Sequence, residues 1–483
     1  MKKSVFLLLI FLFPCTIFGQ DIPRMGLLLD DEAYEDVPMK ARNVAFQDVV
    51  GEQPRTSLRK FLPTIRNQKG YGTCVGWSAA YYGRTILNAR RRNMTDKVEI
   101  DKNAYSPVFT YLNANVDDDY NCQGGAFIGK AMETMVEMGT PFFNEYDVLC
   151  DTAVPDALVE SAKQNKIKDF TRLYGSDETN IVKIESVKRS LLNGNPVIIG
   201  FMVQNSFYSA KNVFEPDGGD FTGGHAMCVI GYDDDKYGGS FEIVNSWGTN
   251  WGNDGLMWVR YDDFANHTRY AFEMIPQKKI IQEDKKEKKL LAGQLALKLY
   301  DGSKMDVSKG AGDYKKTVLG WQDVVMDEEV QSIGDYTTKT AYPINTRYRM
   351  YAEVSKPAYV YVIGADSNGD SGVLFPHQEE ISPYIAYENT SVIVPGEQYW
   401  FRLNSDVASD YSVVIFSENK VDVNEAKQRL DAMDGDLMDK LYIIFKDELI
   451  AKDQVKLKDG KMGFEAEYEK GTMALMVLDI KRS

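Results

Sequence analysis

A charge-dense stretch, PQKKIIQEDKKEKK at residues 276–289, divides the chain into two parts with different hydrophobic patterns. Before it, helical and strand patterns alternate: VKIESVKRSLLNG repeats apolar residues at helical spacing, and NPVIIGFMV follows as a buried strand. After it, short alternating strands such as RYRMYAEV and AYVYVIGAD are separated by Pro, Gly, Asn and Asp. We therefore expect an α+β domain, a charged linker, and a mainly-β domain of the sandwich or barrel type.

The first twenty residues have the form of a secretory signal peptide. Lys2 and Lys3 precede an apolar run that is too short to span a bilayer, and small and polar residues follow it. We expect residues 1–20 to be removed and the mature protein to be secreted, periplasmic or at the cell surface. Cys15 fits a lipid-attachment signal poorly because Pro14 directly precedes it. No later stretch is apolar for long enough to predict a transmembrane segment.

The charge balance narrows the choice of partner. The formal net charge is −15 over 483 residues. Because binding to a nucleic-acid backbone needs clustered Lys and Arg, we expect no nucleic-acid partner. No cofactor and no metal site is predicted.

Cys74 stands where a glycine-rich loop, GYGT, meets an apolar helical stretch, CVGWSAAYYGRTIL. A helix N-terminus offers unpaired backbone N–H groups that favour a thiolate, which is the nucleophilic form of cysteine. Such a nucleophile needs a base. Among the three histidines, His225 is flanked by glycines at the start of a buried strand, whereas His267 lies in a polar segment and His377 lies in the second domain. We therefore pair Cys74 with His225.

Three further residues complete this candidate site. Asn245 ends the next predicted strand, so antiparallel pairing of the two strands would bring it beside His225. Trp247 would then cover their hydrogen bond from water and strengthen it. Gln68 lies close enough before Cys74 to offer its side-chain amide, beside the Cys74 backbone N–H, to an oxyanion.

Three motifs make the chain resemble the papain family of cysteine peptidases. They are NQKGYGTC with Gln68 and Cys74, GGHAMCVIGY with His225, and NSWGTNWGNDG with Asn245. The resemblance covers about residues 55–275. It implies a two-lobed fold, in which a helical lobe carries the cysteine, a β-barrel-like lobe carries the histidine and asparagine, and a cleft runs between them.

The resemblance also implies a mechanism. Cys74 would attack the peptide carbonyl, and His225 would hold the thiolate as an ion pair and then protonate the leaving amine. Asn245 would orient the imidazole, and Gln68 would stabilise the tetrahedral oxyanion.

Substrate contacts follow from the same resemblance. NCQGGAF resembles the family segment whose second glycine pairs main chain to main chain with substrate, a role that falls to Gly125. Ala126, Phe127 and Ala226 match positions that line the pocket for the second residue before the cut. All three are apolar, so we expect a hydrophobic substrate side chain there. The expected substrate-binding residues are Gly124, Gly125, Ala126, Phe127, Ala226 and Trp247.

The cysteines depart from the family pattern. Four remain once Cys15 is removed, and by count alone they allow three full pairings. The family's cysteine three residues before the nucleophile is replaced by Tyr71, so the usual first disulfide cannot form, although its partner survives as Cys122. We hypothesise that Cys122 pairs with Cys150. Cys228 lies in mid-strand and is interpreted as a small buried hydrophobe.

The family's helical pro-segment has no counterpart of its usual length. Residues 21–54 are interpreted as a short, acidic, irregular arm, so either the enzyme is exported active or this arm covers the cleft as an unusual short block. The signal peptide and the missing pro-segment favour a bacterial origin. The second domain faintly resembles β-rich domains of unknown function in bacterial secreted proteins. It would dock a substrate, a partner or the cell envelope, or serve as a spacer.

The predicted organisation is therefore a signal peptide (1–20), an N-terminal arm (21–54), a papain-like catalytic domain (55–275), a charged linker (276–290) and a β-rich C-terminal domain (291–483). The leading hypothesis is an exported cysteine endopeptidase acting on protein or peptide substrates. The alternatives are the same fold acting as an amidase, a transpeptidase or an exopeptidase, or a non-catalytic surface binding module. Retention of all four candidate catalytic residues argues against the binding module.

Overall fold

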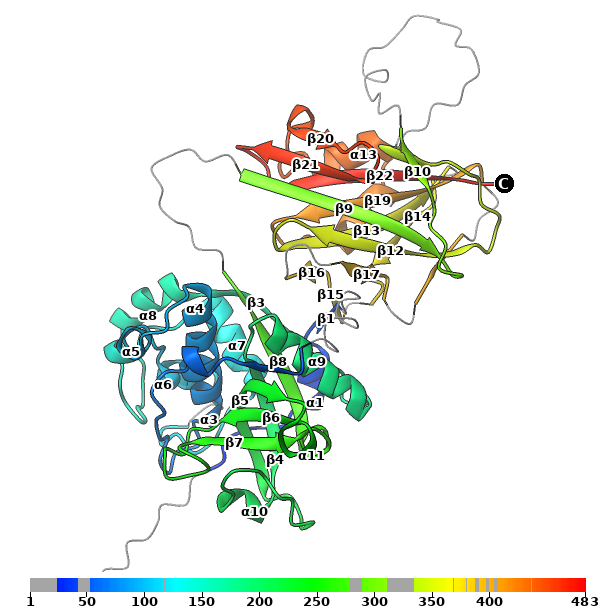
Figure 1. Ribbon diagram of the computed structural model, residues 1–483. Coiled ribbons are helices and arrows are strands. Elements are labelled where there is room, and N and C mark those ends of the chain that lie inside the picture. Colours follow the sequence, from blue (N-terminus) through cyan, green and yellow to red (C-terminus); the bar gives the residue numbers. More distant parts are fainter. Residues whose placement is uncertain are drawn as a thin grey trace, which may run out of the picture.

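The computed structural model divides into a lower body of helices and strands and an upper body made mainly of strands (Figure 1). It describes residues 24–41, 53–116, 119–277, 289–310, 334–367, 369–378, 380–386, 391–396, 399–403, 407–435 and 437–483. The predicted signal peptide, Cys15 and residues 278–288 of the predicted linker lie outside these ranges. Within them, the helices are all too short or too polar to cross a membrane.

The lower body contains one lobe of helices, built around the helix that begins at Cys74. This helix starts as α3 (Cys74–Gly76), widens to π-helical hydrogen bonding over Trp77–Arg84, and ends as α4 (Thr85–Arg91). Its residues are buried almost throughout, so it forms the centre of the lobe. The other helices of this lobe are α5 (Lys97–Lys102), α6 (Pro107–Leu112), α7 (Ile128–Glu137) and α8 (Asp156–Ala162), with 3₁₀ turns at Arg59–Phe61, Phe143–Glu145 and Lys163–Asn165.

The second lobe is a nine-stranded sheet in the order β15-β1-β3-β8-β4-β5-β6-β7, with β2 paired to β5. The long strand β5 (Gly223–Asp233) is paired antiparallel with β4 and β6 and is buried along nearly its whole length. The remaining elements are β2 (Arg55–Ser57), β3 (Ile167–Arg172), β4 (Val197–Val203), β6 (Ser240–Val244), β7 (Leu256–Arg260) and β8 (Thr268–Pro276), with α9 (Asn180–Leu192), α10 (Asn205–Tyr208), α11 (Tyr261–His267) and a turn at Lys236–Gly238.

The described part of the N-terminal arm is ordered, so the expectation of an irregular arm is wrong. It contains α1 (Asp31–Glu35), which Asp30 caps by accepting a hydrogen bond from the Ala33 N–H, and the two-residue strand β1 (Met39–Lys40). Tyr34 explains why such a short helix forms, because its side chain is fully buried against Tyr270 and Phe272. Tertiary burial, rather than helix propensity, stabilises α1.

The upper body is a β-sandwich, as expected for a mainly-β domain. A seven-stranded sheet (β10-β11-β22-β19-β13-β14, with β16 on β13) faces a six-stranded sheet (β17-β12-β9-β21-β20, with β18 on β12). Their inner faces share one core, with Leu295 and Met350 from one sheet and Val414 and Met476 from the other. Helices α12 (Val423–Asp431) and α13 (Leu437–Ile444) cover the outer face of the larger sheet.

The strands of the sandwich are β9 (Lys289–Leu299), β10 (Val307–Lys309), β11 (Tyr336–Thr338), β12 (Arg347–Val354), β13 (Ala358–Asp366), β14 (Ser371–Phe375), β16 (Tyr384–Ile385), β17 (Val392–Val394), β18 (Phe401–Arg402), β19 (Ser409–Ser417), β20 (Val455–Leu457), β21 (Gly463–Tyr468) and β22 (Met473–Lys481), with a 3₁₀ turn at Lys452–Gln454. The upper body also contributes β15 (Ile381–Ser382), which pairs with β1 in the nine-stranded sheet. Residues 289 and 290, assigned to the linker from sequence, belong to β9.

Close packing of the Cys74 helix yields a first prediction. A Cβ atom on Gly76 would lie 2.1 Å from the backbone oxygen of Pro107 in α6, so Gly76→Ala must displace main chain. We expect a loss of about 2 kcal/mol or more in the free energy of unfolding, measured by urea denaturation. The matched control is Gly70→Ala, where a Cβ meets open space; its stability should change by less than about 0.5 kcal/mol. Equal stabilities of the two variants would contradict this packing.

Candidate active site

Cys74 lies at the first position of α3 and is completely buried. Burial raises the pKa of its thiol to about 11, because a thiolate loses its hydration there. Backbone N–H groups of Ala226, Gly26 and Val75 point at the sulfur and oppose this rise without overcoming it. In the described form Cys74 is therefore a neutral thiol, although the helix start supplies the donors that a thiolate would use.

His225 and Asn245 are joined across the sheet. His225 lies near the start of β5, Asn245 directly follows β6, and the His225 Nε2 atom is 2.7 Å from the Asn245 Oδ1 atom. The Ser246 N–H also donates to this Oδ1 at 2.7 Å, which identifies it as the acceptor oxygen. His225 must then carry its proton on Nε2, and Nδ1 is the basic nitrogen. Nδ1 is buried and has no hydrogen-bond partner in the described chain.

Aromatic rings seal this pair from water. Trp247 packs against the His225 ring with centroids 4.7 Å apart, and Tyr208 stacks on the other side of Trp247 at 5.3 Å. His225 is wholly buried as a result, and burial lowers the pKa of its imidazole to about 4, although the hydrogen bond to Asn245 opposes this. Both the thiol and the imidazole are thus neutral at pH 7 in this form.

Gln68 lies in the loop before Cys74, with its side chain fixed at both ends. Its Oε1 accepts a hydrogen bond of 2.5 Å from the Ser246 hydroxyl, so its amide group points the other way. That amide donates to the Tyr71 carbonyl at 2.7 Å and to the Arg24 carbonyl at 2.8 Å. The Arg24 carbonyl of the arm therefore accepts the hydrogen bond that the Gln68 amide is expected to donate to an oxyanion.

The N-terminal arm runs directly over these residues. The Gly26 carbonyl accepts from the Ala126 N–H at 2.9 Å, the Leu28 N–H donates to the Ala126 carbonyl at 3.0 Å, and the Leu27 N–H donates to the Gly224 carbonyl at 3.3 Å. Leu27 and Ala126 thus form a parallel bridge. Main-chain contact on both sides of Gly26 explains how Cys74 comes to be completely covered.

Gly125 and Ala126, two of the expected substrate-binding residues, are buried beside the arm, whereas Gly124 is exposed. The main-chain partner of the arm is Ala126 and not Gly125, whose N–H donates instead to the Tyr111 hydroxyl at 2.9 Å. Gly125 has a φ of +84°, and a Cβ there would lie 2.6 Å from the Gly26 oxygen, so its lack of a side chain lets the arm approach. A Cβ on Gly124 would likewise strike Val116.

Leu27 of the arm fills a small apolar recess. Its side chain lies against the positions where Gly200 and Gly224 lack a Cβ, and Tyr270 borders the same space. Phe127 packs edge-on against Tyr270 with centroids 5.8 Å apart, and Ala126 and Ala226 are buried nearby in the same core.

The remaining sequence candidates lie apart from the site. Cys122 and Cys150 are joined in a disulfide, and Cys228 is a buried free thiol in β5. His267 bonds through Nδ1 to the Asp263 carbonyl and stacks on Phe201. His377 lies in the upper body.

Two contributions escaped the sequence analysis. Ser246 positions the Gln68 amide, and Tyr111 holds the Gly125 N–H while its own hydroxyl donates to Asp119. Ser246 lies between Asn245 and Trp247 in the NSWGTNWGNDG motif. A hydroxyl side chain at this position could have indicated a hydrogen bond within the site. Nothing in the sequence around Tyr111 marks it out from other buried aromatic residues.

Known protein families match parts of both bodies. The family model described as papain family cysteine protease matches residues 54–276, and the model of a domain of unknown function, DUF4384, matches residues 341–420. An uncharacterized peptidase C1-like protein of Acanthamoeba polyphaga mimivirus is 29% identical over 217 residues, 41% of this chain and 65% of that protein. The chain thus spans slightly less than two thirds of this relative.

Two further matches concern a mite protein and a solved structure. Peptidase 1 of Psoroptes ovis is 33% identical over 239 residues, which cover 47% of this chain and 68% of that protein. The crystal structure of xylellain, a cysteine protease from Xylella fastidiosa, matches 54% of this chain and 98% of its own with 20% identity and a TM-score of 0.44.

Burial of the imidazole gives a second prediction. Because the pKa of His225 is lowered to about 4, its ring should stay neutral from pH 8 down to pH 5 in the native protein. In the urea-unfolded chain it should titrate near its ordinary value of about 6.5. The folded form then binds fewer protons than the unfolded chain, so this group's contribution to stability falls as pH drops through 6.5 toward 4.

NMR of the His225 Cε1–H signal, assigned by its loss in His225→Gln, measures this titration. A native midpoint near pH 6.5 would contradict the buried, neutral ring.

Proposed function

Because the chain belongs to the papain family of cysteine proteases, we propose that it is an exported cysteine endopeptidase that hydrolyses peptide bonds in proteins. The observation that carries this proposal is the Arg24 carbonyl hydrogen-bonded to the Gln68 amide above the covered Cys74. A peptide carbonyl from the chain itself thus rests where a substrate carbonyl would be polarised. Export rests on the sequence of residues 1–20 alone.

The proposed chemistry begins with a proton transfer between Cys74 and His225, which no hydrogen bond joins in the covered form. Nδ1 of His225 takes the Cys74 proton, and the thiolate adds to the peptide carbonyl carbon. The resulting oxyanion accepts hydrogen bonds from the Gln68 amide and the Cys74 N–H. When the C–N bond breaks, the imidazolium returns its proton to the leaving amine and a thioester remains. His225 then removes a proton from water, which attacks the thioester carbon. The C–S bond breaks, the acid leaves, and the imidazolium returns its proton to the Cys74 sulfur.

Asn245 and Ser246 act on geometry. Asn245 fixes the imidazole with Nε2 protonated and Nδ1 basic. The basic Nδ1 therefore lies on the side of the ring away from the hydrogen bond between Nε2 and Asn245. Ser246 holds the Gln68 carbonyl oxygen, so the amide N–H groups face the carbonyl to be attacked. Both are positioning residues in this proposal.

The described form is latent. No substrate carbonyl can reach Gln68 while the arm occupies it, and Cys74 is completely covered. Release of the arm admits water to Cys74, which removes the desolvation that raises the pKa of its thiol. The helix N–H groups then favour thiolate beside imidazolium, the reactive pair. Burial by the arm thus blocks access and lowers reactivity together.

A casein assay under reducing conditions tests the activity. Tyr34→Ala removes the buried anchor of α1, including its hydrogen bond to the Tyr174 carbonyl, without touching the proposed catalytic residues. A truncation of this kind costs about 3 kcal/mol, so the uncovered fraction and the rate of cleavage should rise by about 100-fold over the unaltered chain.

Two control variants set the limits of the expected increase in cleavage. Tyr34→Phe keeps the ring and should give a smaller increase, and Tyr34→Ala with Cys74→Ala should be inert. A folded Tyr34→Ala protein that cleaves no casein would contradict the endopeptidase proposal and leave amidase, transpeptidase, exopeptidase or binding roles.

The recess that holds Leu27 gives a prediction of specificity. We propose that it receives the second residue before the cut, lined by Ala126, Phe127 and Ala226. A peptide library cleaved by the Tyr34→Ala variant should prefer Leu, Val or Phe over Arg or Asp at that position by about tenfold or more, because a charged side chain would be buried there without a partner. Preference for Arg or Asp would overturn this assignment.

A further inference from the structure

The arm is held over the active site by several separate contacts. Next to the cleft, Asp31 pairs with Arg269, whose Nε donates to Asp31 Oδ1 at 2.7 Å, and this contact lowers the pKa of Asp31. Behind it, the buried Arg172 donates to the Val37 carbonyl at 2.7 Å and pairs with Glu35 at 3.0 Å. These contacts all join the arm to the lower body.

The next contact joins the arm to both bodies. Strand β1 lies between β3 of the lower body and β15 of the upper body, and both pairings are parallel (Figure 1). Met39 is in register with Arg172 on one side and with Ile381 on the other, and the Met39 N–H donates to the Glu380 carbonyl. A two-residue strand is marginal by itself, so it depends on these two edge partners.

Lys40 ties the same strand to a buried carboxylate. Its Nζ lies 2.6 Å from Glu273 Oε2, which is 1% exposed and also accepts from the Ser190 hydroxyl at 2.5 Å. Desolvation lowers the pKa of Lys40, while Glu273 opposes that effect. Withdrawal of β1 would separate this buried pair, which makes partial release of the arm unfavourable.

The upper body is seated on the lower one by contacts that do not involve the arm. Lys168 of β3 donates to the Glu418 carbonyl at 2.6 Å and lies over the rings of Tyr359 and Tyr384, at 4.7 and 4.9 Å. The Tyr359 hydroxyl donates to Asp169 at 3.4 Å. They join the two bodies in addition to the pairing of β1 with β3 and β15.

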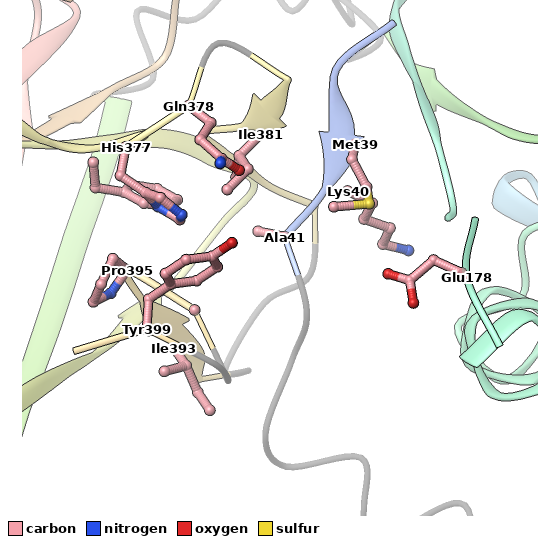
Figure 2. A pocket seen from close by; sticks show the side chains of 12 residues that line it. Met39, Lys40, Ala41, Glu178, His377, Gln378, Ile381, Ile393, Pro395 and Tyr399 are labelled. Atoms are coloured by element: carbon pink, nitrogen blue, oxygen red, sulfur yellow. The ribbon is translucent and has the colours of Figure 1, made fainter. Parts of the chain in front are cut away.

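The side of β1 toward the upper body is not closely packed. Figure 2 shows a cavity bordered by Met39, Lys40 and Ala41 of the arm, and by His377 and Tyr399 of the upper body. Main-chain pairing joins β1 to β15, and Ala41 next to β1 adds an apolar contact with the sandwich core that contains Ile381. Separation of β1 from β15 therefore costs this pairing and the contact of one small side chain.

We propose that the β-rich C-terminal domain is a clamp that holds the inhibitory arm in the active-site cleft through β15. This role rests on the proposed function and gives its regulation: a displaced C-terminal domain removes one edge partner of β1, and the arm then leaves Cys74 more often. The domain thereby acts on the site without contributing a residue to it.

Alkylation of Cys74 by iodoacetamide, followed by peptide mapping of the full chain, tests the clamp. Met39→Pro removes the N–H that donates to Glu380 and keeps the strand extended, whereas the matched control Met39→Ala keeps this N–H and loses only the side chain. Loss of one such hydrogen bond should make Cys74 in Met39→Pro react about fivefold faster than in Met39→Ala. Cys228, buried in β5, must stay unlabelled in both, which shows that the lower body remains folded.

A second variant weakens the contact between the two bodies at a place that the arm does not touch. Lys168→Ala removes the contact with Glu418 and both rings, and should speed labelling several-fold relative to Lys163→Ala, a lysine exposed on the same body. Equal rates within either pair of variants would overturn the clamp.

Labelling of the thiol does not depend on peptide cleavage. Faster labelling of Cys74 without casein cleavage would therefore support the clamp and reject the peptidase. Casein cleavage without faster labelling would support the peptidase and reject the clamp.

Discussion

The antiparallel pairing of β5 with β6 is the constraint on which the site depends. The register that sets Cys228 opposite Val244 brings His225 and Asn245 to the same end of the two strands. Because side chains alternate between the faces of a sheet, a slip of one residue would turn His225 to the other face and break its 2.7 Å hydrogen bond to Asn245. The tautomer of the imidazole, and so the position of the base, follows from backbone hydrogen bonds rather than from any feature of the histidine itself.

Exclusion of water strengthens the hydrogen bond between His225 and Asn245, and it also makes the covered site unreactive. Trp247 and the arm exclude water, so the pKa of Cys74 is raised and that of His225 is lowered. Each shift disfavours the charged form, and together they favour thiol and imidazole over thiolate and imidazolium. The arm does this with main chain: Gly26 lies over the sulfur, and its neighbours pair with Ala126 and Gly224. Its centre still depends on sequence, because a Cβ on Gly26 would lie 1.8 Å from the Gly72 backbone oxygen and the Leu27 side chain fills the apolar recess.

That reliance on main chain explains what the sequence could and could not predict. The motifs around Cys74, His225 and Asn245 named residues that the fold brings to one region, because a nucleophile, a base and an amide need particular side chains in a particular order. The sequence also predicts the two bodies, because mixed helical and strand patterns before residues 276–289 give way to short alternating strands after them. The arm offers no helical period to a sequence prediction, because α1 is only five residues long and its stability comes from burying Tyr34 against distant strands. Strand β1 left no pattern at all, since two residues cannot display a period.

Coupling between the bodies follows from how such anchors combine. The arm is one continuous chain, so the contacts at Asp31, Tyr34, Arg172, Lys40 and Met39 each reduce the fraction of time that Cys74 is uncovered, and their free energies add where they act independently. An element that contributes only about 1 kcal/mol then changes exposure of the thiol about fivefold, however far it lies from the sulfur. A domain that meets the arm through a two-residue strand is thus sufficient to regulate the site, and its contribution stays small enough to be reversed.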